Sequence, residues 1–255
     1  MNPFLEHEEQ VERAFFEKLE KEELISDPRH LPILCRRLLE KTILMNFFAE
    51  WWGGVNYFRC LSKAPSYHEL QFMEQIAREE MGHAHILAKG SLAVLGIDPF
   101  LLITKTVKEQ KQLLHVFKYP EILTRSWSDV LIFNCLQDAS ADMQLDEFAN
   151  GMFTPYCTDI KQIEAEEVGH VEHGHRAIRE YLASQTQHKA ELQQALDFWL
   201  PLVLEVFGKK DGKSEQLYRT YGIKHRTNEE SRTIFTVQIS PFLSELGLRH
   251  VLLGA

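Results

Sequence analysis

The sequence has few of the residues that mark several common classes of protein. Only four of its 255 residues are cysteine, at positions 35, 60, 135 and 157, and no two of them form a CxxC pair. The pattern excludes the usual zinc-ribbon and disulfide-framework arrangements and predicts four free thiols. No uninterrupted apolar run reaches about 18 residues, so we expect no membrane-spanning helix.

Positive charge is also in short supply. Lysine and arginine number 28 against 37 acidic residues, which gives a formal net charge of −9. This balance argues against nucleic acid as the main partner, because phosphate neutralisation needs a basic surface. The first residues, MNPFLEHEEQVERAFFEKLEKEE, are charged throughout and lack the apolar core of a signal peptide. We therefore expect a cytoplasmic protein.

Glycine and proline, with 13 and 9 copies, fall mostly between long stretches of helical period, and alternating β-branched runs are almost absent. The sequence predicts an all-α fold in one domain of residues 1–255. Its parts are an N-terminal helix in 1–29, a four-helix core in about 31–184 and a helical extension in 185–255. Helices are predicted at 4–24, 31–62, 67–94, 127–150, 156–184 and 188–207, with shorter ones at 99–113 and 227–246.

One pentapeptide frame occurs twice, as EEMGH at 79–83 and as EEVGH at 166–170. In both predicted helices the second glutamate and the histidine, Glu80 with His83 and Glu167 with His170, share a face with apolar residues. A carboxylate facing a core is costly unless it is paired or binds a metal. The histidine three residues later is a good ligand for a transition metal, so each pair predicts half of a dinuclear metal site.

A ferritin-like site also needs one acid from each of two further helices. Glu50 precedes Glu80 by 30 residues on an apolar stripe, and Asp138 precedes Glu167 by 29 residues on another. These matched spacings predict two helical hairpins around a pseudo-two-fold axis. Asp142 lies one turn further along the stripe of Asp138 and is the alternative ligand.

Several neighbouring polar residues have simpler interpretations. Glu79 and Glu166 turn about 100° away from the ligand face, so we expect surface acids or outer partners of the ligands. His85, His173 and His175 are interpreted as solvated or core histidines. The basic segment 209–226 is predicted to be a loop with short helical turns and is interpreted as a solvated face, with an anion-binding surface as the alternative.

With these residues in place, the chain resembles the ferritin-like di-iron carboxylate superfamily and, within it, the phenylacetic-acid catabolic family. Segments in the family's order include AEWWGG at 49–54, LQDASAD at 136–142 and LDFWLPLVLEVFG at 196–208. The resemblance covers about residues 30–248. It implies a ferritin-like four-helix bundle and a ligand set that includes Asp138 rather than Asp142: Glu50, Glu80, His83, Asp138, Glu167 and His170. All six positions are filled, which matches the family's catalytic type better than its non-catalytic subunit. Ile76 stands where the resemblance leads us to expect a lysine.

The resemblance implies a monooxygenase with two iron ions, although the ligand set also suits manganese. Glu50, Glu80 and Glu167 would act as metal ligands, with no separate acid or base assigned. The substrate would be aromatic or unsaturated, such as the acyl-CoA thioester phenylacetyl-CoA, oxidised with O₂. A separate reductase would supply electrons, because the sequence shows no flavin, haem or iron–sulfur motif. A related non-catalytic subunit or a second copy of the chain would be a further partner. The alternatives are a ferroxidase and a non-catalytic scaffold subunit.

Overall fold

The computed structural model describes residues 3–101, 104 and 126–249, and these residues form helices with no β-strand. The α-helices are α1 (Pro3–Glu20), α2 (Ile33–Cys60), α3 (Tyr67–Leu87), α6 (Trp127–Ala149), α7 (Thr154–Ser184), α8 (His188–Leu204), α9 (Lys213–Thr220) and α10 (Asn228–Glu245). The all-α prediction is confirmed. No helix in the described part of the chain is both long and apolar enough to span a membrane.

Most predicted helix boundaries agree with the structure within a few residues. The first helix is the exception, since it was predicted to reach residue 24 and ends at Glu20. Glu22 has a φ of 57°, and Ile25 is extended and forms an isolated bridge with Phe153. The buried contact of Ile25 therefore sets the end of α1. Residues 99–101 begin the helix predicted at 99–113, and most of the remainder lies outside the described residues.

Polar side chains define where the core helices begin. Ser66 accepts a hydrogen bond from the backbone N–H of Glu69 at the start of α3, and Ser126 does the same for Asp129 at the start of α6. Such N-caps satisfy backbone donors that have no partner within the helix. In α10 the cap is reciprocal, because Thr227 and Glu230 bond each other's backbone N–H.

Helix α3 continues through a π-helical turn at Ala88–Leu92, where Gly90 leaves helical geometry. Asp159 of α7 accepts the backbone N–H of Ser91 at 2.7 Å. A Cβ on Gly90 would collide with the Asp159 carboxylate. Glycine at this position therefore lets α7 repair the interrupted hydrogen bonding of α3.

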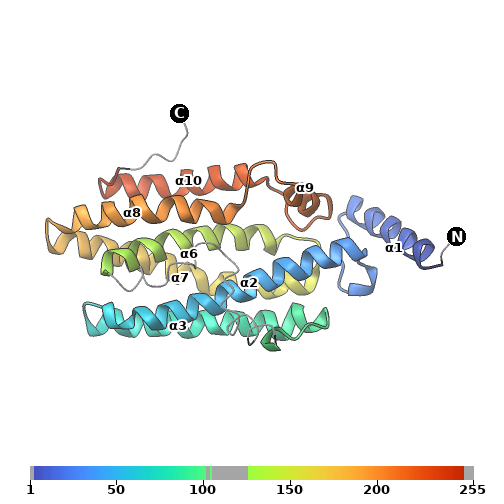
Figure 1. The fold of residues 1–255 in the computed structure, drawn as a ribbon, viewed down its shortest axis with the longest axis horizontal. Coiled ribbons are helices and arrows are strands. Elements are labelled where there is room, and N and C mark those ends of the chain that lie inside the picture. Colours follow the sequence, from blue (N-terminus) through green and yellow to red (C-terminus); the bar gives the residue numbers. More distant parts are fainter. Residues whose placement is uncertain (1–2, 102–103, 105–125, 250–255) are drawn as a thin grey trace.

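Two antiparallel hairpins form the core of the bundle (Figure 1). Helix α2 packs along α3, α6 packs along α7, and α3 contacts α7 between the hairpins. Helices α8 and α10 cover α6 on one side of the bundle, and α1 and α9 lie at one end (Figure 1). The C-terminal extension thus packs on the hairpin of α6 and α7.

The buried apolar residues form two clusters, one towards each end of the hairpins. One contains Phe47, Leu87 and Ile163, and the other contains Tyr57, Met73 and Ala177. On α2, α3 and α7 the predicted ligands fall between the residues that belong to one cluster and those that belong to the other. The metal-ligand candidates therefore occupy a polar layer within an apolar bundle.

Candidate metal centre

Each predicted ligand lies on one of the four core helices. Glu50 comes from α2, Glu80 and His83 from α3, Asp138 from α6, and Glu167 and His170 from α7. All six are buried, with exposed fractions of 8% or less. The structure therefore brings residues from four helices into the interior, as the matched spacings led us to expect.

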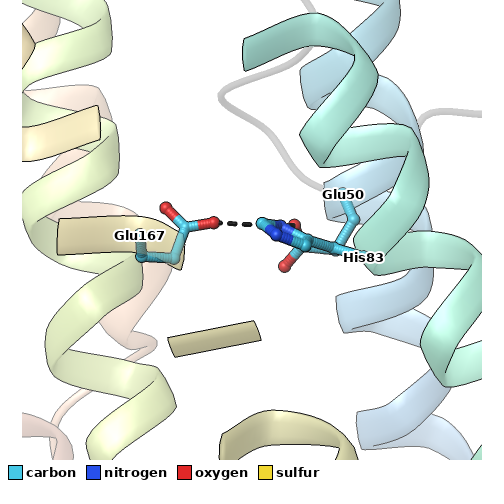
Figure 2. Close-up of side chains that lie close together, drawn as sticks. All are labelled: Glu50, His83 and Glu167. Carbon is cyan, nitrogen blue, oxygen red and sulfur yellow. Dashed lines mark hydrogen bonds and ion pairs between the residues drawn. The ribbon is translucent and has the colours of Figure 1, made fainter. Parts of the chain in front are cut away.

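One group of possible metal-binding atoms is formed by Glu50, His83 and Glu167. Nδ1 of His83 lies 3.3 Å from Oε2 of Glu50 and 3.1 Å from Oε1 of Glu167. Figure 2 shows Glu167 reaching from one side of the bundle towards the imidazole of His83 and the carboxylate of Glu50. This group joins the two hairpins.

A second group is formed by Glu80, Glu167 and His170. Nδ1 of His170 lies 3.1 Å from Oε2 of Glu167 and 3.5 Å from Oε1 of Glu80. Within each group the ligand atoms lie within 4.8 Å of one another. Glu167 belongs to both groups and offers one carboxylate oxygen to each, which is the placement expected of a bridging ligand.

Burial changes the protonation of this cluster. It raises the pKa of Glu50, raises that of Glu80 well above its usual value with the help of the Glu167 charge, and raises that of Asp138 to about 7. Burial also opposes ionisation of Glu167, but hydrogen bonds from His170 and His83 outweigh it and lower its pKa to about 2.

The two histidines shift in the opposite direction. Burial disfavours their charged form, but hydrogen bonds to the neighbouring glutamates outweigh it and raise the pKa of His83 to about 10 and of His170 to about 9. In the absence of a cation, protons therefore balance the buried carboxylates.

This donor set fits two divalent metal ions. The four carboxylates of Glu50, Glu80, Asp138 and Glu167 carry four negative charges when ionised, and two neutral imidazoles add none. Two divalent ions would neutralise that charge and replace the protons. Carboxylate and imidazole donors suit iron and manganese, so the residues present fit a dinuclear centre of either metal.

The outer nitrogens of both histidines contact the first glutamate of the opposite pentapeptide. Nε2 of His83 lies 3.1 Å from Oε2 of Glu166, and Nε2 of His170 lies 2.9 Å from Oε2 of Glu79. Such carboxylate partners fix the tautomer and orientation of a ligating histidine. The expectation that Glu79 and Glu166 are outer residues is confirmed, and each supports a histidine of the other hairpin.

Asp138 stands apart from both groups of ligand atoms. It is 6% exposed, and its two carboxylate oxygens lie 3.2 and 3.4 Å from Oη of Tyr57, which donates its one hydrogen to this carboxylate. Asp142, the alternative, is only half-buried and does not line the cavity of about 50 Å³ that Asp138 borders. The structure thus places Asp138 nearer the site than Asp142, and its role as a ligand stays a prediction.

The neighbouring histidines take structural positions. His173 pairs with Glu69 at 3.1 Å and stacks on Phe72 with ring centroids 3.6 Å apart. His85 is exposed, and His175 stacks on Phe242. The structure agrees with their interpretation as core or solvated histidines, and it also places His173 at a small cavity lined by Asp138 and His170.

A cavity of about 50 Å³ borders four of the predicted ligands, Glu50, Glu80, Asp138 and Glu167. A Cβ on Gly53, which also lines the cavity, would collide with the carboxylate of Glu80. Glycine at position 53 therefore leaves room for the carboxylate of Glu80, one of the predicted metal ligands. Gly53 and Tyr57 were not identified as site residues from the sequence, because a glycine and a tyrosine on an apolar stripe are typical of ordinary helix packing.

A larger pocket of about 340 Å³ is lined by residues of α2 and α6 and, for the greater part, by residues of the C-terminal segment 206–228. We call it the lysine pocket because Lys41, Lys209 and Lys224 are among its lining residues. Asn46 also lines it and lies one helical turn, about 6 Å, before Glu50 on α2. One residue of the lysine pocket therefore lies one turn from a metal-ligand candidate on the same helix.

Comparison with known proteins agrees with the resemblance seen in the sequence. Residues 26–250 match the family model described as phenylacetic acid catabolic protein. The chain is 25% identical over 240 residues to one of the subunits of 1,2-phenylacetyl-CoA epoxidase from Escherichia coli (strain K12), a match that covers 93% of this chain and 76% of that relative. The chain therefore belongs to the phenylacetic acid catabolic protein family.

Proposed function

We propose that the protein is a di-iron monooxygenase that uses O₂ to epoxidise or hydroxylate an aromatic or unsaturated acyl-CoA thioester such as phenylacetyl-CoA. The observation that carries the proposal is the position of Glu167, with one oxygen towards each of two ligand groups. Family membership and the similarity to an epoxidase subunit support the reaction class.

Bound iron would supply the binding of O₂ and the redox chemistry, and the chain would supply position and environment. Glu50, His83 and Glu167 would hold one ion, and Glu80, His170 and Glu167 the other, with Asp138 as a further ligand. Glu166 and Glu79 would keep the Nδ1 atoms of His83 and His170 directed at the metals. The apolar clusters on both sides would keep water from the reacting atoms.

The substrate would bind with its phosphates in the lysine pocket and its acyl end towards the 50 Å³ cavity, and residues of α2 and α6 line both. The lysine pocket offers the ammonium groups of Lys41, Lys209 and Lys224, which attract phosphates, and an acyl-CoA carries phosphates at one end and its acyl group at the other. Phosphates held there would leave the acyl end directed at the 50 Å³ cavity. The basic segment interpreted from the sequence as a solvated face contributes two of these lysines.

The electrons would come from a separate reductase, and the relative is named as one subunit of an epoxidase. We expect a partner protein on these grounds, either a related subunit or a second copy of the chain. Reconstitution with candidate partners and size measurement in solution would identify it.

The oxygenase proposal is tested with iron-loaded protein, a reductase, phenylacetyl-CoA and ¹⁸O₂. Mass spectrometry should find one ¹⁸O atom in the product, and Glu80→Ala and His170→Ala should abolish its formation. His85→Ala, which changes an exposed histidine of α3, is the matched control and should retain activity. Iron oxidation without an oxygenated product would instead indicate a ferroxidase, and a protein that binds no iron would indicate a scaffold.

The lysine pocket is tested by a neighbouring pair of residues. Lys209 lines the pocket and the adjacent Lys210 does not, and both are exposed. Calorimetry should show that Lys209→Glu weakens binding of phenylacetyl-CoA at least tenfold, whereas Lys210→Glu changes it much less. Equal effects of the two variants would mean that only the overall charge matters.

A further inference from the structure

Tyr57 contacts the predicted ligand that stands apart from the other five. Its Oη lies 3.2 and 3.4 Å from the two carboxylate oxygens of Asp138. The tyrosine is 6% exposed and lines the 50 Å³ cavity together with Asp138. The phenol can donate only one hydrogen, so it occupies one of the several acceptor positions of the carboxylate and leaves the others for a metal.

This contact has no counterpart in the other hairpin. Glu50 and Asp138 are equivalent positions, and Tyr57 lies seven residues after Glu50 (57 − 50 = 7). Seven residues after Asp138 is Leu145, a buried side chain that cannot donate a hydrogen bond. Glu50, for its part, contacts Nδ1 of His83 instead of a phenol. The two halves of the site therefore share their ligands but differ in how the single acid is held.

The different contacts of Glu50 and Asp138 concern the second ligand group, that of Glu80, Glu167 and His170, more than the first. Glu50 already lies in the group of His83 and Glu167, whereas Asp138 lies in neither group of three. Asp138 and Tyr57 both line a small cavity that also borders His170, a member of the second group. A metal bound at Glu80, Glu167 and His170 would therefore find its fourth protein ligand through the position that Tyr57 gives to Asp138.

We propose that Tyr57 is a positioning residue that orients Asp138 for the metal at Glu80, Glu167 and His170, and so makes the two metal positions unequal in affinity. The inference rests on the dinuclear site of the proposed function, but not on the reaction or the substrate. The group of Glu50, His83 and Glu167 binds its ion independently of Tyr57, and the second ion depends on it.

The test is a stepwise titration of the metal-free protein with Mn²⁺ or Co²⁺. Calorimetry measures the affinity of each binding step, and the spectrum of the bound metal reports on its ligands. In the unchanged protein we expect two binding steps. Tyr57→Phe should weaken one step by about 10- to 100-fold, as replacement of outer partners of metal ligands typically does, and leave the other within about twofold. The spectrum of the weakened site should change as well.

Tyr221→Phe is the matched control, because it removes the hydroxyl of another buried tyrosine, which donates a hydrogen bond to Glu12 at 3.1 Å and lies beside no predicted ligand. Both of its binding steps should be unchanged. A double-mutant cycle identifies the route of the effect: if Tyr57 acts through Asp138, adding Tyr57→Phe to Asp138→Ala should have little further effect.

Two results would overturn the inference. Tyr57→Phe could leave both steps unchanged, or it could weaken both equally while thermal unfolding shows an intact fold. Two metal steps without any oxygenated product would contradict the proposed oxygenase but leave the role of Tyr57 in place. A protein that binds no metal in either step would contradict both.

Discussion

The hairpin of α2 and α3 and the hairpin of α6 and α7 contain the same pattern of candidate metal ligands in different surroundings. Each carries one acid on its first helix and a glutamate and histidine three residues apart on its second. In one hairpin the single acid is Glu50, which contacts a histidine, and in the other it is Asp138, which contacts a tyrosine. The comparison indicates that the repeated pentapeptide determines which residue types face the centre of the bundle. The residues around it make the two ligand groups different.

The supporting contacts cross between the hairpins. Glu166 lies against His83, and Glu79 lies against His170. Glu167 also belongs to both ligand groups. Neither hairpin therefore forms a complete half-site, and both must pack together before either ligand group exists.

The largest effect is expected from Glu167→Ala, because this residue is common to both groups. Iron content should fall from about two per chain, the number that a ferritin-like di-iron site holds, to nearly none. Glu172→Ala, an exposed position on the same helix, should retain both ions. Elemental analysis of the purified variants provides the measurement, and one iron retained by Glu167→Ala would mean that the groups bind independently.

Smaller and separate effects are expected from the outer glutamates. Glu79→Ala and Glu166→Ala should each weaken one metal by about 10- to 100-fold, because each leaves a different histidine without its partner. The Glu79 variant should lose more metal affinity than the Glu166 variant. The contact of Glu79 with its histidine is shorter than that of Glu166, 2.9 against 3.1 Å, and the Glu79 side chain is less exposed, 30% against 48%.

The matching glutamine variants are the controls for the outer glutamates. Glutamine keeps an oxygen that can accept the Nε2 hydrogen, so Glu79→Gln and Glu166→Gln should recover part of the affinity. Metal titrations in which both alanine variants weaken the same binding step would contradict the crossed arrangement of the hairpins.

The smallest predicted effect is on the pH dependence of the metal-free protein. The pKa values of His83 and His170 rise to about 10 and 9, and that of Asp138 to about 7. The folded state then binds more protons than the unfolded state above about pH 4, so its stability falls as pH rises towards 9. The lowered pKa of Glu167, about 2, stabilises the folded state at neutral pH. This stabilisation is lost as the pH falls below about 4.

Calorimetry of the metal-free protein should therefore show that Tm falls by at least about 4 °C between pH 6 and pH 9. One pKa unit is worth about 1.4 kcal/mol, and 1 kcal/mol moves Tm by about 2–4 °C in a domain of this size. Bound metal should reduce the fall, because it replaces the protons. A Tm that rises over this range in the metal-free protein would contradict the assigned shifts.

The sequence predicted the helices and brought the metal-ligand candidates onto shared faces because both depend on helical period. Stepping three or four residues along an apolar stripe was enough to find Glu80, His83, Glu167 and His170. The same period indicated that Glu79 and Glu166 face away from their own ligands. It could not indicate that each reaches the histidine of the other hairpin, because that contact depends on how the helices pack.

The other missed features have the same cause. Tyr57 lies seven residues after Glu50 on the apolar stripe of α2, and only the approach of α6 places Asp138 beside its hydroxyl. The lysine pocket combines Lys41 of α2 with Lys209 and Lys224 of the C-terminal segment, so no local pattern contains it. Segment 209–226 was predicted to be a loop with short helical turns, and the short helix α9 lies within it.

The most direct test of the dinuclear site is anomalous diffraction at the iron edge from crystals of the iron-loaded protein. Two peaks about 3.5–4 Å apart, the usual separation in two-metal sites, should flank the carboxylate of Glu167, one near His83 and the other near His170. A single peak, or two peaks that do not share Glu167, would contradict the proposed centre.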